Sequence, residues 1–150
     1  MPPAFAATRP VNPPGASPVI TEEQLWKGLE YRARKPQHFA VPMLASAKVT
    51  VDDGKKLTRE TTFRYASQEV IVETITAYAF TIMYFEANTG KRTTNMISYG
   101  PSDELLLTFS FTHGVYGLPE ANGEELNAMV GKEIEDTIDV VRQMVRDGKL

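Results

Sequence analysis

Hydrophobic and polar residues alternate along the middle of the chain with the period of two that is typical of strands. Six such runs lie between residues 39 and 113, and turn sequences such as Asp52-Asp53-Gly54 and Asn88-Thr89-Gly90 separate them. Strands that tight turns join in sequence order pair with their neighbours, so the pattern predicts a six-stranded antiparallel meander. The expected strands lie at residues 39–51, 56–65, 70–78, 80–87, 92–99 and 104–113.

Two other segments repeat hydrophobic residues at helical spacing. The first is predicted to begin at Thr21, which forms a capping box with Gln24, and to end before Pro36. The second is capped by Asn122 and keeps one face hydrophobic for about seven turns, as far as Val145. Such a helix gains stability mainly by packing its hydrophobic face, so we expect it to lie across the sheet.

The first 18 residues contain six prolines, and residues 4–11 are compatible with a short edge strand, where proline is tolerated. The order of elements is then strand, helix, meander and long C-terminal helix in a single domain, residues 1–150. This predicts an α+β fold of the helix-grip (Bet v 1-like) type. A curved antiparallel sheet of about seven strands would wrap round the C-terminal helix and leave an internal hydrophobic cavity.

Composition narrows the classes of function. The chain has 150 residues and a net charge of −3, and 42% of its residues are hydrophobic. Its densest basic run, RARK at residues 32–35, is interpreted as the end of a helix, so nucleic acid is not an expected partner. No hydrophobic run is long enough for a membrane span and the N-terminus does not resemble a signal peptide, so we expect a cytoplasmic protein without membrane insertion.

Several kinds of chemistry lack the residues that they require. The sequence contains no cysteine, which excludes a disulfide framework and a thiolate nucleophile. His38 and His113 are the only histidines and show no metal-ligand spacing, so we expect no metal and no cofactor. The stretch TGKRTT at residues 89–94 fails the P-loop pattern and is interpreted as a hairpin turn.

One charge stands out in the strand predicted at residues 56–65. Counting by twos places Arg59 on the same face as Leu57, Phe63 and Tyr65, where a guanidinium would stabilise developing negative charge on a ligand. Three alternatives remain open: an ion pair with Glu73 or Glu133, or a twist that turns Arg59 to solvent. Glu73 would suit proton transfer if it faces the cavity, but the register of the hairpin at residues 66–69 decides its orientation.

The chain also resembles a known group of proteins. The stretches VNPPG (11–15), LWKGLEYRARKPQHF (25–39), LTRETTF (57–63) and TNMISYGPSDELLLTF (94–109), together with the C-terminal amphipathic helix, resemble the AtaL-like group of the SRPBCC (START/Bet v 1-like) superfamily. This resemblance implies a deep cavity for a hydrophobic ligand. It fixes no reaction, because the superfamily includes both carriers and cyclases.

These observations give two hypotheses. The first is a cofactor-independent cyclase, isomerase or dehydratase acting on a polyketide- or peptide-derived intermediate, and the second is a carrier of a small hydrophobic metabolite. A homodimer remains possible in either case. The expected catalytic residues are Arg59, Glu73 and Tyr65. The expected ligand-binding residues are Trp26, Phe63, Met83, Tyr84, Asn95, Met96, Tyr99, Leu107, Phe109, Met129 and Glu133.

Overall fold

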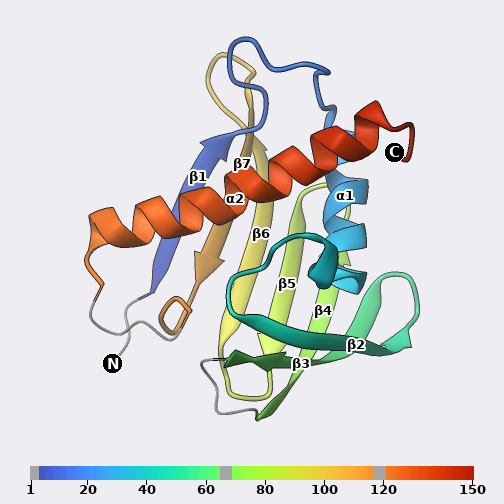
Figure 1. Cartoon of the computed structure of the whole chain (residues 1–150), viewed down its shortest axis with the longest axis vertical. Helices are drawn as coiled ribbons and strands as arrows, with labels where there is room; N and C mark the ends of the chain where they lie inside the picture. The colour runs from blue at the N-terminus through green and yellow to red at the C-terminus, as the bar shows by residue number, and fades with distance from the viewer. Residues whose placement is uncertain (1–3, 65–68, 117–120) are drawn as a thin grey trace.

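A single antiparallel sheet forms the framework of the fold. The computed structural model describes residues 4–64, 69–116 and 121–150, and within them seven strands pair in the order β1-β7-β6-β5-β4-β3-β2. The predicted meander is confirmed, and the predicted N-terminal strand pairs with the last one at the sheet edge (Figure 1). The strands are β1 (Phe5–Pro10), β2 (Leu44–Asp52), β3 (Lys56–Phe63), β4 (Val70–Tyr78), β5 (Ile82–Ala87), β6 (Arg92–Tyr99) and β7 (Leu105–Phe111).

The strand expected from residue 39 begins five residues later than predicted. A short 3₁₀ helix, η1 (Pro36–His38), follows the first α-helix, and β2 starts only at Leu44. Ala40 and Met43 have positive φ angles of 47° and 60°, which break an extended conformation. Pro42 has no N–H to donate to a strand ladder, so the hydrophobic run at residues 39–43 forms a turn instead.

Both predicted helix starts are confirmed. Helix α1 (Glu22–Arg34) begins at Thr21, whose hydroxyl accepts a 3.2 Å hydrogen bond from the backbone N–H of Gln24. The Gln24 side chain accepts in return from the Thr21 N–H at 2.9 Å and completes the capping box. Helix α2 (Gly123–Arg146) is capped by the Asn122 side chain, which accepts from the Glu125 N–H at 2.9 Å.

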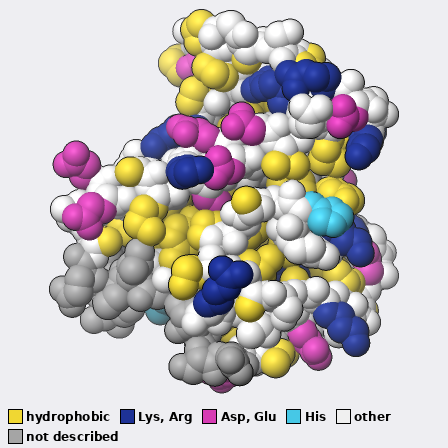
Figure 2. Space-filling model, viewed as in Figure 1, with side chains coloured by type: hydrophobic (Ala, Val, Ile, Leu, Met, Phe, Trp, Pro, Cys, Tyr) yellow, Lys and Arg dark blue, Asp and Glu magenta, His cyan; other side chains and the backbone are white. Residues whose placement is uncertain are grey.

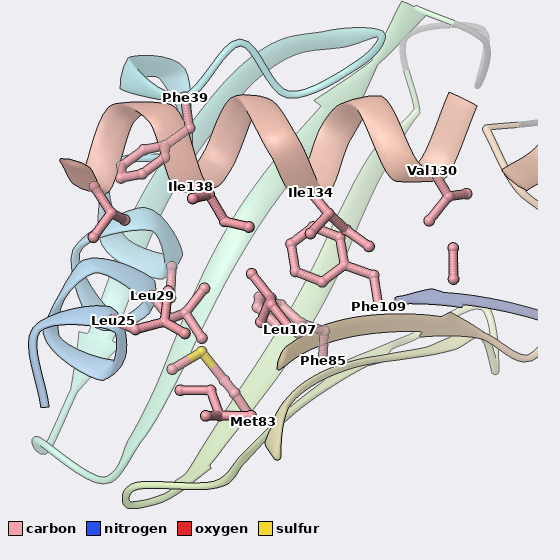
Figure 3. Close-up of a cluster of buried hydrophobic side chains, with 14 of the residues drawn as sticks. Leu25, Leu29, Phe39, Met83, Phe85, Leu107, Phe109, Val130, Ile134 and Ile138 are labelled. Atoms are coloured by element: carbon pink, nitrogen blue, oxygen red, sulfur yellow. The ribbon is translucent and has the colours of Figure 1, made fainter. Parts of the chain in front are cut away.

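Helix α2 crosses one face of the sheet, and α1 lies beside its C-terminal half (Figure 1). Ile134 and Ile138 of α2 point toward the core residues Leu107 and Phe109 of β7 (Figure 3). Gly28 of α1 allows the two helices to approach closely, because a Cβ there would lie 2.5 Å from Val141 Cγ2. This packing confirms the predicted helix-grip arrangement of a sheet around a long helix.

The surface over α2 carries charges of both signs, and hydrophobic side chains appear below it, toward β2 (Figure 2). This distribution agrees with a helix whose one face is polar and whose other face is buried. None of the described helices combines the length and the hydrophobicity that crossing a membrane requires.

Candidate functional site

A cavity of about 90 Å³, partly open to solvent, lies between the inner face of the sheet and the two helices. Strands β3 to β7 supply most of its wall. The rest comes from α1, η1, α2, the turn at residues 41–42, the connection between β5 and β6, and Tyr116 after β7. Pockets that enclose whole drug-sized ligands have volumes of roughly 300–1,000 Å³. The cavity therefore has room for one end of a hydrophobic molecule.

The ladder between β3 and β4 brings a buried ion pair to the cavity wall. Arg59 and Glu73 are directly opposite one another, so their side chains share the inner face. Arg59 Nε lies 3.1 Å from Glu73 Oε1, which also accepts a 2.7 Å hydrogen bond from the Thr61 hydroxyl. Arg59 Nη1 donates to the Ala33 carbonyl at 2.8 Å. Within the described part of the chain, Arg59 Nη2 and Glu73 Oε2 make no hydrogen bond, which leaves them available to a ligand.

A second buried ion pair joins the two helices across the cavity. Arg32 Nη2 of α1 donates to Glu133 Oε1 of α2 at 2.7 Å, and both side chains are less than one-tenth exposed. Burial raises the pKa of the Glu133 carboxyl, and the nearby Arg32 guanidinium only partly opposes this shift. Burial similarly lowers the pKa of Arg59, with Glu73 acting in the opposite direction. Among these groups Glu133 is therefore the one that burial prepares to hold a proton.

Lys91 is a third cation on the cavity wall. It follows the turn between β5 and β6, and it makes no ion pair with the described residues. Burial lowers the pKa of its ammonium, while the charges of Glu73 and Glu133 raise it. Each of the three cations also lies over an aromatic ring of the wall: Arg32 at 5.0 Å from the Phe109 centroid, Arg59 at 5.3 Å from Phe85 and Lys91 at 5.4 Å from Phe111.

Four buried side-chain atoms of the described residues have no hydrogen-bond partner, and the residues that carry them all line this cavity. Buried polar groups without partners are rare in folded proteins, because each costs about 1–3 kcal/mol. Their concentration at one place marks the cavity as a polar binding site within an otherwise hydrophobic wall. The atoms are Arg32 Nε, Asn95 Nδ2, Tyr116 Oη and Glu133 Oε2.

The structure brings six of the residues expected from the sequence to the cavity: Arg59, Phe63, Glu73, Asn95, Phe109 and Glu133. Arg59 faces inward, and of the alternatives left open for it the ion pair with Glu73 is present. Glu73 also faces inward and is 8% exposed, which settles its orientation. Tyr65 lies outside the described residues.

Seven other expected ligand-binding residues do not line the cavity. Trp26, Met83 and Leu107 are buried in the hydrophobic core. Tyr84 and Met96 alternate with the cavity residues Phe85 and Asn95 along their strands, and successive side chains of a strand point to opposite faces.

The remaining two of the seven reach solvent. Tyr99 is 52% exposed and donates its hydroxyl to Glu22 at 2.5 Å. Met129 of α2 is 38% exposed, because it lies beside the buried stripe of the helix and outside the packed face. Neither position contacts the cavity.

Arg32, Lys91 and Tyr116 line the cavity but were not expected there. Arg32 lies seven residues after Leu25 and three after Leu29, so helical spacing alone puts it on the buried stripe of α1. Lys91 is two positions before Thr93 and four before Asn95, which is the inward phase of β6. No sequence pattern identifies Tyr116, which follows the last strand.

The two histidines lie outside this site. The ring nitrogen Nδ1 of His38 is 2.6 Å from the Tyr31 hydroxyl, and that of His113 is 2.7 Å from the Thr112 hydroxyl. Among the described residues, no three His, Asp or Glu side chains are grouped in a way that would hold a metal ion.

Solved structures with the same fold are distant in sequence. The Zhui aromatase/cyclase from Streptomyces sp. R1128 superposes with a TM-score of 0.55 at 13% identity, covering 95% of this chain and 93% of that one. A protein from Thermus thermophilus, TTHA0849, gives 0.60 at 12% identity over 99% and 100% of the two chains. At such identities the likeness shows the fold.

The di-domain ARO/CYC StfQ, from the steffimycin biosynthetic pathway, gives a TM-score of 0.61 at 10% identity. The match covers 96% of this chain and 50% of that protein. The di-domain ARO/CYC BexL is likewise covered over 48% of its length, so this chain spans about half of each di-domain protein.

A comparison of the sequence with protein families is more specific than the likeness in fold. No curated protein matches it in sequence. Residues 5–148 match a family described as acetylaranotin biosynthesis cluster protein L. This match includes every described strand and helix, together with all the cavity residues. The chain therefore belongs to the AtaL family.

Proposed function

We propose that the protein is a cofactor-independent enzyme of natural-product biosynthesis that cyclises, isomerises or dehydrates a hydrophobic intermediate held in the cavity. The observation that carries this proposal is the group of buried polar atoms without partners on a wall whose surface is otherwise mostly hydrophobic. The family description, which refers to a biosynthetic gene cluster, supports it. So do the names of three structural neighbours, since Zhui is an aromatase/cyclase and StfQ and BexL are di-domain ARO/CYC proteins of biosynthetic pathways.

Electrostatic stabilisation is the first contribution that the site offers. Cyclisation, isomerisation and dehydration of a carbonyl compound all pass through an enolate-like state with negative charge on oxygen. Arg59 Nη2 and the Asn95 amide both lie on the cavity wall with hydrogen atoms free to donate to such an oxygen. Donors that are already oriented in a site shielded from water stabilise this charge strongly.

Proton transfer is the second contribution. Glu133 has one oxygen committed to Arg32 and the other free toward the cavity, and burial raises its pKa. A carboxyl group with these properties suits general acid–base catalysis near neutral pH. Tyr116, whose hydroxyl also lacks a partner, would orient the substrate or relay the proton. We assign this step to Glu133 and not to Glu73, because burial raises the pKa of Glu133, whereas Glu73 accepts from two donors, Arg59 and Thr61.

The experiment uses the intermediates that accumulate when the gene is deleted in a producing host. Incubated with the purified protein, they should be converted to new products that chromatography and mass spectrometry detect. Arg59→Met should lower turnover by about 10²–10³-fold, and Glu133→Gln by about 10²–10⁴-fold. Tyr99→Phe, which changes an exposed side chain outside the cavity, is the matched control. Identical product profiles with and without the protein would remove the proposal.

One observation favours the alternative, a carrier that binds the metabolite without altering it. Arg59 is already held by Glu73 and by the Ala33 carbonyl, so much of its charge serves the fold. If this is its whole role, Arg59→Met should retain activity or binding. Native mass spectrometry would then recover a bound metabolite with unchanged mass and structure.

A further inference from the structure

The charges on the cavity wall do not cancel. Within the described residues, three cations and two carboxylates line the cavity: Arg32, Arg59 and Lys91 against Glu73 and Glu133. Each carboxylate is paired with an arginine, at 3.1 Å for Glu73 and 2.7 Å for Glu133. Lys91 is therefore left as an excess positive charge. Any proton taken up by Glu133 would increase this excess, because it would remove a negative charge from the wall.

The hydrogen-bonding capacity of the wall has the same bias. Of the four buried atoms without partners, Arg32 Nε and Asn95 Nδ2 can only donate, and the Tyr116 hydroxyl can donate as well. The Tyr116 hydroxyl can also accept, so the ionised Glu133 Oε2 is the one atom of the four that can only accept. A wall with unused donors and one uncompensated cation is complementary to an acceptor that carries negative charge.

Lys91 is the cation best placed to respond to such a group. Lys91 is half-buried, and its ammonium lies 5.4 Å from the centroid of the Phe111 ring and is attracted by both carboxylates without forming an ion pair with either. Arg32 and Arg59 are fixed by their ion pairs, whereas among the described residues the Lys91 ammonium has no hydrogen-bond partner, so its three N–H groups can donate to a ligand.

We propose that the cavity selects a hydrophobic ligand with one carboxylate and that Lys91 is the residue that anchors this carboxylate. The aromatic rings of the wall contact the body of the ligand, and Asn95 donates a further hydrogen bond to its acidic end. The inference rests on the cavity being the ligand site, as the proposed function requires, but it needs no reaction to occur.

A pair of small probes isolates the charge. Cinnamate and cinnamamide have nearly the same shape, and they differ in that only cinnamate is negatively charged at neutral pH. Each is titrated into ¹⁵N-labelled protein at low salt, and the amide shifts report both the affinity and the location of binding. Cinnamate should shift amides of the cavity residues on β6 and β7 and should bind at least about tenfold more tightly than cinnamamide, as expected for a hydrogen bond to a charged group.

Variants then test the role of Lys91. Lys91→Met should abolish the preference for cinnamate and leave the binding of cinnamamide unchanged, and Lys91→Arg should keep the preference. Lys55→Met is the matched control, because Lys55 also follows a hairpin glycine and lies over an aromatic ring, 4.9 Å from the Tyr78 centroid, but outside the cavity.

Three results would overturn the inference: equal affinities of the wild type for the two probes, a preference that survives in Lys91→Met, or no cavity shifts up to the solubility limit of cinnamate. The proposed function can fail separately. In that case cinnamate would bind as expected, while the biosynthetic intermediates would be recovered unchanged.

Discussion

Breaking the ion pair between Arg59 and Glu73 has a cost that can be worked out from its geometry. Arg59 Nε and Glu73 Oε1 are 3.1 Å apart, and the side chains are only 9% and 11% exposed. At that separation two unit charges attract by about 5 kcal/mol for an effective dielectric constant of about 20. Desolvation of both groups offsets much of this attraction. Replacing one member of the ion pair therefore measures chiefly the cost of leaving the other member buried without a partner.

We expect Glu73→Met to lower the free energy of unfolding by about 3–5 kcal/mol. The guanidinium of Arg59 would stay charged at any accessible pH, and the Thr61 hydroxyl would lose its acceptor. Arg59→Met should cost less, because the remaining carboxylate can take up a proton. The double variant should lie within about 1 kcal/mol of the wild type, since neither charge then remains.

Urea unfolding followed by far-ultraviolet circular dichroism measures these differences. Arg92 and Glu86 provide the matched control, because they are also ladder partners on neighbouring strands, with 3.5 Å between their charged atoms, but are about half exposed. Arg92→Met should change the unfolding free energy by less than about 1 kcal/mol. The reasoning would be refuted if the double variant were as unstable as Glu73→Met, or if Glu73→Met cost no more than Arg92→Met.

Three further predictions concern other parts of the fold. Gly28→Ala should destabilise the protein by about 1–3 kcal/mol in thermal unfolding, because its Cβ would meet Val141 Cγ2 at 2.5 Å. Adding Val141→Ala should restore most of this loss. The control is Gly123→Ala, which should cost little because a Cβ at Gly123 would meet no other atom. Burial raises the pKa of Glu133 above its ordinary value near 4.5, so the folded protein holds this proton more tightly than the unfolded chain. The free energy of unfolding should therefore fall as the pH rises from this ordinary value through the pKa of Glu133 in the folded protein. Glu133→Gln should remove this pH dependence. Tyr99→Phe should shift the unfolding free energy by less than about 0.5 kcal/mol, because its hydroxyl bond is exposed.

The elements of the fold could be predicted because local patterns determine them. The caps at Thr21 and Asn122 define both helix starts, and hairpin turns separate the strands of the meander. The inward orientation of Arg59 also follows from local information, since it is two residues from Leu57 in one strand. The start of β2 could not be placed, because hydrophobic residues before Leu44 resemble a strand while their backbone turns.

The orientation of Glu73 depends on a non-local property. A shift of one residue in the pairing of β3 with β4 would turn Glu73 to the other face. In the structure, Glu73 is the ladder partner of Arg59, and the Thr61 hydroxyl provides a second donor on the same face. The opposite charges of Arg59 and Glu73 favour this register, but the sequence alone does not exclude the other.

Arg32 shows how residue type can mask a correct spacing. The run RARK suggests cations at the end of a helix, and Arg34 agrees with this, because it lies in the last turn of α1 and forms a partly exposed ion pair with Asp52. Arg32 lies in the same helical turn but on the stripe of Leu25 and Leu29, so it is buried and pairs with Glu133. For Arg32, the spacing of residues along the helix predicts burial better than the charge of the side chain does. The same holds for the spacing of Arg59 along its strand and of Lys91 from the inward-facing residues of β6.

The charged groups of the cavity are difficult to explain as a means of stabilising the fold. Well-packed hydrophobic residues in place of a buried ion pair often leave a protein equally or more stable, and the unpartnered atoms of Asn95 and Tyr116 add a further cost. An uncompensated cation at Lys91 increases this cost, because burial disfavours its charge. A cost in stability of this kind is typical of sites whose polar groups are arranged for a ligand or a transition state. Variants that remove Lys91 should therefore gain stability and lose selectivity together, a combination that a purely structural lysine would not produce.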